Sequence, residues 1–530
     1  MTASSKVRRL DGPTLRHPLG AYLAYRTDPL TLFYEQAVAH GGSVRLRLAH
    51  QHVHLLVEPE HINQVLVGSA TKYVKGISYQ SLNYLLGPGL LTSGGELWKR
   101  QRALIKPAFA RRHVQTEIPL MVAGGERMLT RLDALAAHGE VFDLVPEVMG
   151  FAADVVCRAV MGADIDGVLP QIEGDVREGV SWVMGHMAAP VRLPPGVPTP
   201  ANRRFTGVRA RLHRVVDDIV HQHRQAGSSD ATSLLARLLV ARDDAGHAMD
   251  DEQLRHEVLT FLLAGHETTG GAMAWTIYEL CRNPVVLGRI RAEIDTVLKA
   301  SSERGAGSSH TARIGGPSGV SVAHGPVGVA GVGVAGVGGV SVVSGLGGPG
   351  AEPGIDRPRG TDRVGGISAH TLPSLELTGH AIDEAMRLHP PAWGFSRTVL
   401  ERDSFDRFDL EPGSIVVISP FVNHRWPEFW DSPLTFDPDR FTKAQTKTRP
   451  PFHYFPFGWG AHLCVGQHMA LMEVRVGIAM LLSRYDIELV NGIRVRENPE
   501  ISNTPDPVLV RLTRRESSVP TTRTMQEAAR

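Results

Sequence analysis

Residues 457–466 of this chain read Phe-Gly-Trp-Gly-Ala-His-Leu-Cys-Val-Gly, and an apolar helical pattern follows them directly. Gly458 and Gly460 permit positive φ angles and a close approach of the backbone to another group. Cys464 stands at the start of the predicted helix, where N–H donors and the helix dipole stabilise a thiolate. A lone cysteine is more often an inert buried thiol. This setting instead favours a cysteine that serves as a ligand, beside a backbone that Gly466 lets lie against a flat cofactor.

The composition excludes several classes of protein. Among 530 residues, 56 Lys and Arg nearly balance 55 Asp and Glu, which argues against nucleic acid as the main partner. Three cysteines are too few for a disulfide framework and suit a reducing compartment, so we expect a cytoplasmic protein. Residues 1–27 contain neither the apolar centre of a signal peptide nor a membrane span, so no membrane anchor is expected.

Hydrophobic periodicity predicts a mainly α-helical chain with a small β region near each end. Pro190–Pro200 contains five prolines and is expected to be a loop. Helices are predicted over residues 95–106, 114–137, 147–161, 203–225, 231–243, 250–282, 284–298, 375–388 and from 464 to about 485. Strands are predicted over residues 43–48, 52–58, 414–419 and 508–512.

Residues 301–369 interrupt this pattern with a Gly, Val and Ala repeat. Dense glycine raises the entropy cost of fixed structure, and bulky apolar residues are too few for a membrane span. We interpret the segment as a flexible, tolerated surface insertion. We expect the whole chain, residues 1–530, to form a single domain. Its core would comprise residues 15–300 and 370–515, and residues 516–530 would be a tail.

Three further patterns are unremarkable when each is taken alone. Glu384 and Arg387 share one face of a helix, as do Trp98 and Arg102, and such pairs are ordinary on protein surfaces. Residues 264–271 read Ala-Gly-His-Glu-Thr-Thr-Gly-Gly within the longest helix. Glycine there costs about 1 kcal/mol relative to alanine, and the glycines alone favour a close contact with another helix.

Taken together and in this order, the patterns resemble those of the cytochromes P450. The loop of that family reads Phe-x-x-Gly-x-Arg/His-x-Cys-x-Gly, and the matching residues here are Phe457, Gly460, His462, Cys464 and Gly466. The resemblance implies haem b with Cys464 as the axial ligand of the iron. His462 stands where most members have arginine, so the charge of this expected propionate-binding residue would depend on pH.

The same resemblance implies roles for the other patterns. Glu384 and Arg387, with Arg440 as a third member, would form a structural network that locks the Cys464 loop. Trp98, Arg102 and Arg397 would reach the haem propionates. Ala264 would border the oxygen-binding groove, where the Thr268 hydroxyl bonds back to the Ala264 carbonyl and leaves a kink. Glu267 and Thr268 would be the catalytic acid–alcohol pair that delivers protons.

The implied fold is the triangular, mostly helical prism of the family, and the implied reaction is monooxygenation with dioxygen. Electrons would come from NAD(P)H through a separate ferredoxin reductase and ferredoxin, and the enzyme would act as a monomer. A basic cluster is expected to dock the ferredoxin: Arg100, Arg102, Lys106, Arg111 and Arg112. The alternatives are a peroxygenase or isomerase of the same fold and a non-enzymatic haem-binding protein, neither of which needs the acid–alcohol pair.

The substrate pocket is expected between residues 77–91, 180–197 and 263–268. Its apolar side chains would be Ile77, Leu82, Leu85, Leu86, Leu90, Leu91, Met184, Met187 and Val191. They imply a lipophilic substrate such as a terpenoid, fatty acid, polyketide or steroid, and no sequence feature selects among these.

Overall fold

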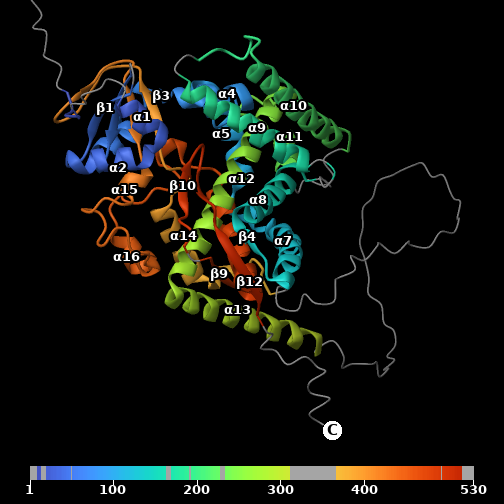
Figure 1. The fold of residues 1–530 in the computed structure, drawn as a ribbon. Coiled ribbons are helices and arrows are strands. Elements are labelled where there is room, and N and C mark those ends of the chain that lie inside the picture. Colours follow the sequence, from blue (N-terminus) through green and yellow to red (C-terminus); the bar gives the residue numbers. More distant parts are fainter. Residues whose placement is uncertain are drawn as a thin grey trace, which may run out of the picture.

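The computed structural model describes residues 9–13, 20–48, 51–162, 167, 169–189, 192–226, 233–310, 366–490 and 492–515. Helices form most of this part of the chain (Figure 1). They are α1 Gly20–Thr27, α2 Pro29–Ala39, α3 Pro59–Asn63, α4 Ile77–Leu86, α5 Gly95–Ile105, α6 Arg111–Gln115, α7 Ile118–His138, α8 Leu144–Met161, α9 Leu169–Ala188, α10 Pro200–Ala226, α11 Leu234–Val240, α12 Asp251–Arg282, α13 Pro284–His310, α14 Glu376–Leu388, α15 Pro420–Asn423, α16 Lys443–Thr448 and α17 Gln467–Arg484.

Helix α12 runs through the middle of the helical part, with α8, α14 and α17 packed along it (Figure 1). It begins where the Asp250 side chain accepts a hydrogen bond from the Gln253 N–H, and Asp251 and Glu252 complement the positive end of the helix dipole. Because side chains around the whole circumference are buried, α12 behaves as a core helix and not as an amphipathic surface helix. It therefore carries its central residues to the interior of the molecule.

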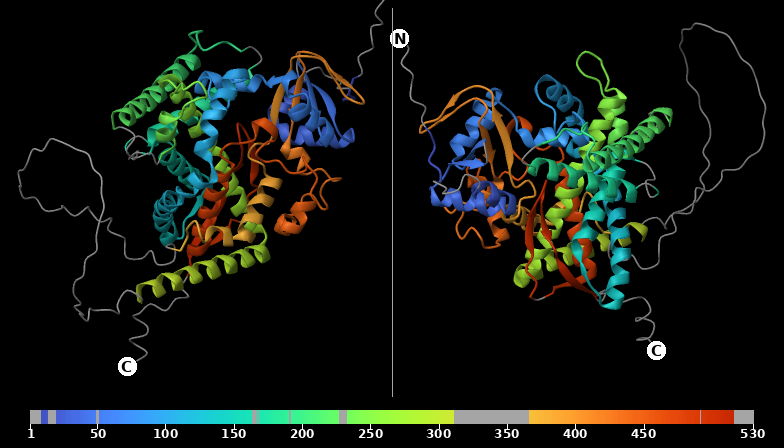
Figure 2. Two further views of the ribbon diagram at one scale, coloured as in Figure 1. Left: turned by 180° about the vertical axis from the view of Figure 1, so that it is seen from behind. Right: turned by 45° about the horizontal axis from the view of Figure 1, so that its top comes forward.

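Within the described residues the strands form four small sheets, the largest of which lies to one side of the helical part (Figure 2). They are β1 Val44–Leu48, β2 Gln51–Leu56, β3 Tyr73–Lys75, β4 Val141–Asp143, β5 Phe395–Val399, β6 Asp403–Ser404, β7 Asp409–Leu410, β8 Ile415–Ile418, β9 Tyr485–Leu489, β10 Arg496–Pro499, β11 Asn503–Asp506 and β12 Leu509–Arg514. The largest sheet has the order β1-β2-β8-β5-β3, in which only the β2 and β8 pair is parallel. Antiparallel pairing of β3 with β5 sets Lys75 opposite Arg397.

The predicted long helices and the four predicted strands are confirmed, with ends shifted by a few residues except at the end of α13, which extends well beyond residue 298. The helix expected over 114–137 is divided into α6 and α7 at Thr116 and Glu117, just before Pro119. The last helix begins at Gln467, three residues after Cys464. Helices α1, α2, α4 and α9 had not been predicted.

The expected insertion begins later than residue 301. Helix α13 continues to His310, so residues 301–310 belong to it. A Cβ added to Gly366 would meet the Ser301 Cβ at 3.1 Å, and Ile367 joins the main core with 8% of its surface exposed. The repeat itself, like the tail at 516–530, lies outside the described residues.

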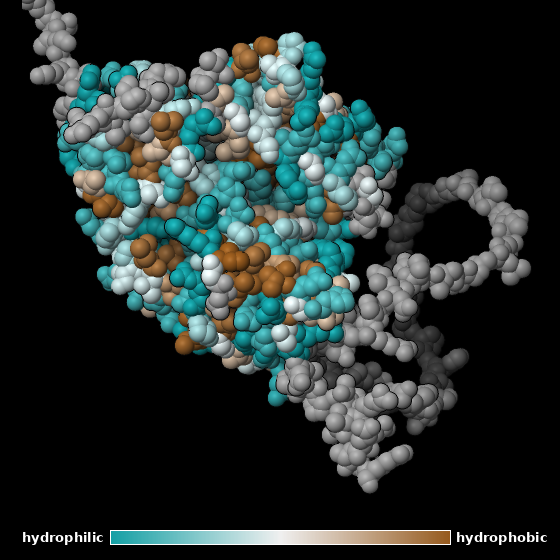
Figure 3. All heavy atoms as spheres, in the orientation of Figure 1, coloured by the Kyte–Doolittle hydropathy of each residue, from teal (hydrophilic) through white to brown (hydrophobic). Residues whose placement is uncertain are grey.

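The surface is mainly polar on the face drawn in Figure 3, with apolar side chains gathered near the middle of that face and in smaller groups elsewhere. None of the described helices combines the length and the apolar character needed to cross a bilayer.

Candidate active site

The Cys464 loop is a closed turn that precedes α17. The Cys464 N–H donates to the Phe457 carbonyl at 3.0 Å, and the Leu463 N–H donates to the Gly460 carbonyl at 3.2 Å. Gly458 and Gly460 have φ angles of +73° and +67°, as the sequence predicts. At Gly460 a side chain would also meet the Leu66 carbonyl oxygen at 3.0 Å, so glycine is required there.

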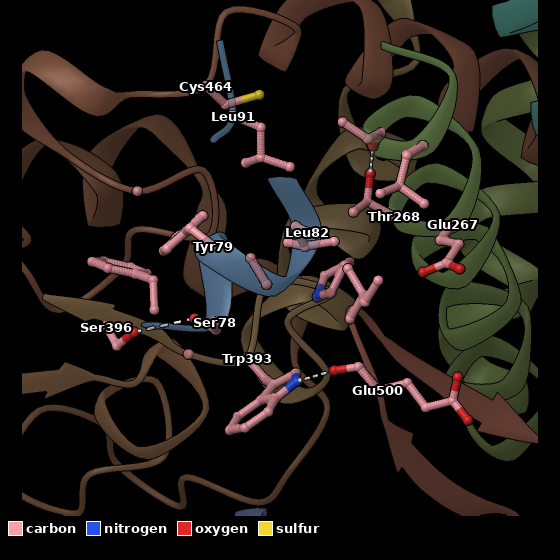
Figure 4. Close-up of a pocket in the computed structure, with 18 of the residues that line it drawn as sticks. Ser78, Tyr79, Leu82, Leu91, Glu267, Thr268, Trp393, Ser396, Cys464 and Glu500 are labelled. Atoms are coloured by element: carbon pink, nitrogen blue, oxygen red, sulfur yellow. Dashed lines mark hydrogen bonds between the residues drawn. The ribbon is translucent and has the colours of Figure 1, made fainter. Parts of the chain in front are cut away.

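The Cys464 sulfur is surrounded by protein but open to an internal cavity, into which it points (Figure 4). Burial raises the pKa of the thiol, whereas the backbone N–H groups of Gly466 and Gln467 and the charge of Arg102 act in the opposite direction. These donors are aimed at the sulfur because the chain turns into α17 at this point. The loop is therefore built to stabilise a thiolate once a metal ion shares its charge.

The cavity has a volume of about 1110 Å³ and a predominantly apolar lining. Cys464 lies on one wall, and Ala264, Glu267 and Thr268 of α12 lie on another (Figure 4). Pockets for a single drug-sized ligand span roughly 300–1,000 Å³. This cavity is thus large enough for a flat cofactor over the sulfur together with a substrate between that cofactor and α12.

Basic side chains gather at one end of the cavity. Lys75, Arg102 and Arg397 line it together with His462, and each of the three cations donates a hydrogen bond to a backbone carbonyl, of Leu90, Leu463 and Ser396 respectively. Within the described ranges, no carboxylate lies within ion-pair distance of these cations. Burial, followed by the charge of Arg397, lowers the pKa of Lys75 to about 7. Such unbalanced positive charge fits the two propionate carboxylates of a haem.

Trp98 lies between two members of this basic group. Its ring is 4.0 Å from the His462 ring and 5.6 Å from the Arg102 guanidinium carbon. Burial, with the charges of Arg397, Lys75 and Arg102, lowers the pKa of His462 to about 3. In the field of the protein's own groups this imidazole is therefore neutral near pH 7.

Helix α12 presents Thr268 and Glu267 to the cavity in different directions. The Thr268 hydroxyl donates to the Ala264 carbonyl at 2.6 Å, as predicted. Glu267 instead accepts a hydrogen bond from Ser502, with an Oγ to Oε2 distance of 3.3 Å. Burial, followed by the charge of Glu500, raises the pKa of Glu267 to about 7.

The glycines of this segment serve packing. A side chain on Gly265 would meet Val156, with 2.6 Å to its Cγ2, and one on Gly270 would meet Met149, with 2.5 Å to its Sδ. Both partners belong to α8. The close helix–helix contact that the glycines alone favour is thus observed.

The Glu384–Arg387 pair at the centre of the expected network is fully buried. Arg387 donates to both carboxylate oxygens of Glu384, at 2.6 and 2.8 Å, and neither side chain is exposed. The same guanidinium also donates to three backbone carbonyls, those of His424, Pro433 and Thr435. Arg440 completes the group with an ion-pair contact of 3.4 Å to Glu384.

His424 connects this network to the Cys464 loop, and no pattern in the sequence had singled it out. Its carbonyl accepts from Arg387, and its ring Nε2 accepts from the Phe455 N–H at 2.9 Å. Burial holds the pKa of His424 well below its usual range, so the ring is neutral and able to accept. Phe455 stands two residues before the loop that carries the cysteine.

The three segments expected to line the pocket all contribute to it, although not through every named side chain. Leu82, Leu90, Leu91, Met184 and Met187 line the cavity, whereas Leu85 and Leu86 are buried in the core. The side chains of Ile77 and Val191 lie outside the described part of the chain. The contributions from α1 and α2, from residues 391–396 and from residues 498–501 were not predicted from the sequence.

Local sequence patterns could not have identified Lys75, Glu500 or Ser502. Lys75 belongs to a three-residue strand, which is too short for any periodicity. Glu500 and Ser502 occupy a turn that only the tertiary fold brings to α12.

Comparison with known proteins agrees with this geometry. The sequence profile described as "Cytochrome P450" matches residues 11–308 and 355–512. This chain belongs to the cytochrome P450 family. Members of that family bind haem through an axial cysteine, which in this cytochrome P450 is Cys464. The chain is a monooxygenase and has the mainly helical fold of the family.

Among curated P450 relatives, "Cyclooctatin synthase" from Streptomyces melanosporofaciens is 28% identical over 523 residues, which cover 95% of this chain and 97% of that protein. "Pentalenene oxygenase" from Streptomyces avermitilis is 27% identical over 470 residues, with 88% of each chain covered. The crystal structure of the cytochrome P450DA heme domain superposes with a TM-score of 0.75 at 20% identity, covering 97% of this chain and 100% of that one.

Proposed function

We propose that this cytochrome P450 oxygenates an apolar, ring-containing terpenoid, with protons delivered by Glu267 and Thr268 and electrons from a separate ferredoxin. The observation that carries the proposal is the placement of the cysteine sulfur and of this acid–alcohol pair on different walls of one apolar cavity (Figure 4). Peroxygenases and isomerases of this fold often lack such a pair, and a haem-binding protein needs no proton relay.

Several residues would hold the haem, which supplies the activation of dioxygen when it is bound. Arg102, Arg397, His462 and Lys75, which line the cavity, would bind the propionates. Phe457, Gly460 and Gly466 would shape the loop that presents Cys464 to the haem, and Trp98 packs against His462. The Glu384 network would then act on the loop through His424 and Phe455.

Proton delivery is assigned to the two α12 side chains. Because its pKa is raised to about 7, Glu267 is available near neutral pH both as a proton donor and as a proton acceptor. The Thr268 hydroxyl is held by the Ala264 carbonyl, so its lone pairs face the cavity, where they can orient a water molecule. A proton would pass from the Glu267 carboxyl towards Thr268 and from there to the reacting oxygen.

The substrate class follows from the lining and from the relatives. Leu82, Leu91, Met187, Phe261 and Leu263 offer an apolar surface that provides few polar groups for a hydrophilic molecule. The name "Pentalenene oxygenase" describes action on a cyclic alkene, and "Cyclooctat-9-en-7-ol 5-monooxygenase" describes action on a cyclic alkenol. Both kinds of compound suit a lining of this character.

The electron donor would bind beside the Cys464 loop. Arg100 does not contribute, because it is bound to Asp243 at 2.6 Å and to the Ala248 carbonyl, and Arg102 faces the cavity. The exposed members of the basic cluster are Lys106, Arg111 and Arg112. They suit an acidic ferredoxin, and three free thiols suit a reducing cytoplasm.

Replacing Thr268 tests the proton assignment. With pentalenene as the probe substrate, Thr268→Ala should still consume NAD(P)H but release mainly hydrogen peroxide. Product per electron should fall by about 10²- to 10⁴-fold, the usual contribution of an organised proton donor.

Thr276→Ala is the matched control. Thr276 makes the same backbone bond, to the Ala272 carbonyl at 2.6 Å, but it does not line the cavity. This variant should keep the wild-type yield of product per electron. Thr268→Ser, which retains the hydroxyl, should also keep most of the yield that Thr268→Ala loses. Unchanged coupling in Thr268→Ala would show that the residue only shapes the helix.

A further inference from the structure

The turn between β10 and β11, residues 500–502, reaches the reaction cavity from outside the helical core. Glu500 and Ile501 line the cavity, and Ser502 is buried with 2% of its surface exposed. The turn is held firmly: the Glu500 carbonyl accepts from the Trp393 indole at 3.2 Å, and the Asn503 carbonyl accepts from the Trp275 indole of α12 at 3.2 Å. Side chains on this turn therefore have a defined position relative to α12.

Ser502 is the hydrogen-bond partner of Glu267. Its hydroxyl donates to Glu267 Oε2 at 3.3 Å, while Thr268 is engaged with its own helix. In Figure 4 the carboxyl groups of Glu267 and Glu500 lie on the same side of the cavity, away from Cys464. Glu267 is thus turned towards the β10–β11 turn and must swing from it to serve Thr268.

Glu500 is the charged group that acts on Glu267 across this space. After burial, its carboxylate is the second cause of the raised pKa of Glu267, and the Ser502 hydroxyl opposes both. Two other titratable groups near this space, on α12 and α17, are not among the causes of the raised pKa of Glu267. His266 on α12 is influenced by Arg177, and Glu473 on α17 is influenced by Asp154 of α8.

We propose that Ser502 and Glu500 are positioning residues for the proton supply: Ser502 holds the Glu267 carboxyl ready beside the turn, and Glu500 keeps a proton on it. The exposed Glu500 carboxylate disfavours a second negative charge nearby. Ser502 does the reverse, because its O–H stabilises the ionised Glu267. The two residues thus set the protonation of the acid from opposite directions. This inference rests on the proposed role of Glu267.

Infrared titration of the haem-loaded enzyme tests the inference without a substrate. The protonated-carboxyl band that titrates in the wild type and is missing in Glu267→Gln belongs to Glu267. Glu500→Gln removes the like charge, so the midpoint of that band should move to lower pH by roughly half to one pH unit. Ser502→Ala removes the donor to the ionised form, so the midpoint should move to higher pH.

Two control variants separate this effect from a general disturbance of the hairpin. Asp506→Asn removes a carboxylate from β11 outside the cavity and should leave the midpoint where it is. Ser502→Thr keeps the hydroxyl and should restore the wild-type value.

Midpoints that do not move in Glu500→Gln and Ser502→Ala, or that move in the same direction, would overturn the inference. The proposed function fails by a different result, namely a Glu267→Gln enzyme that couples NAD(P)H to product as well as the wild type does.

Discussion

At the scale of single residues, burial decides what a common sequence pattern does. Glu96 and Lys99 lie three positions apart on α5 and form an ion pair of 2.6 Å, as Glu384 and Arg387 do on α14. The first pair is exposed to water, which screens it and solvates each partner. The second pair has no exposed surface, so each charge depends on the other and on the surrounding carbonyls.

This difference predicts unequal costs when one partner is removed. Arg387→Ala removes the bidentate partner of a buried carboxylate and the donor to three carbonyls, which should lower the free energy of unfolding by about 3–5 kcal/mol. Haem content should fall as well, because His424 and the Cys464 loop lose their support. Denaturant unfolding and the haem-to-protein absorbance ratio measure the two effects.

Glu96→Ala is the control with the same spacing and distance. It should change the free energy of unfolding by at most about 0.5 kcal/mol. Similar losses in both variants would show that the buried network contributes no more than a surface pair.

At the scale of elements, the boundary of α13 changes which residues can be removed. Gly366 lies beside Ser301, whereas α13 continues to His310. A helix rises 1.5 Å per residue, so His310 and the position of Gly366 beside Ser301 are about 14 Å apart along α13. A chain of five or more residues can span such a distance.

Deleting residues 312–364 and inserting about eight Gly and Ser residues should therefore leave haem content and thermal unfolding unchanged. Loop closure entropy varies only slowly with length, which limits any gain or loss. Deleting 301–369 is the comparison, because it also removes Ile367 from the core and should cost about 1.5–3 kcal/mol. Loss of haem in the shorter deletion would mean that the Gly/Val repeat supports the fold.

At the scale of the whole molecule, the distribution of charge over the surface matters more than the net charge. The chain has a formal net charge of +1, yet Lys106, Arg111 and Arg112 are exposed near the Cys464 loop. Phe109, which lies between them in the sequence, brings them to this loop, because its ring would be 3.9 Å from a Cβ added at Gly466. A basic surface there would attract an acidic electron donor over the side of the haem that holds the cysteine.

Charge reversal of Arg111 and Arg112 to Glu should raise the KM for ferredoxin by about tenfold at low salt, and the difference should shrink as salt is added. The spectral affinity for substrate should stay the same. Reversal of Arg203 and Arg204 on α10, which packs on α9, α11 and α12, serves as the control. Equal effects from the two reversals would place the ferredoxin elsewhere.

Much of this architecture can be predicted from the sequence because it depends on residues that are close together in the chain. The turn at 457–466 needs glycine where φ is positive, and the long helices follow from apolar residues that recur with the period of a helix. The back-bond from Thr268 to Ala264 is local in the same way, since it joins residues one turn apart. These features could be predicted without any knowledge of the rest of the molecule.

Only the tertiary structure places Lys75 opposite Arg397, Ser502 on Glu267 and His424 beneath Phe455. Ser502 and Glu267 are 235 positions apart in the sequence. Such contacts depend on how strands pair and where the chain reverses, and neither leaves a periodic pattern in the residues that finally meet. The neutrality of His462 has the same origin, because burial and the charges of distant basic residues determine it.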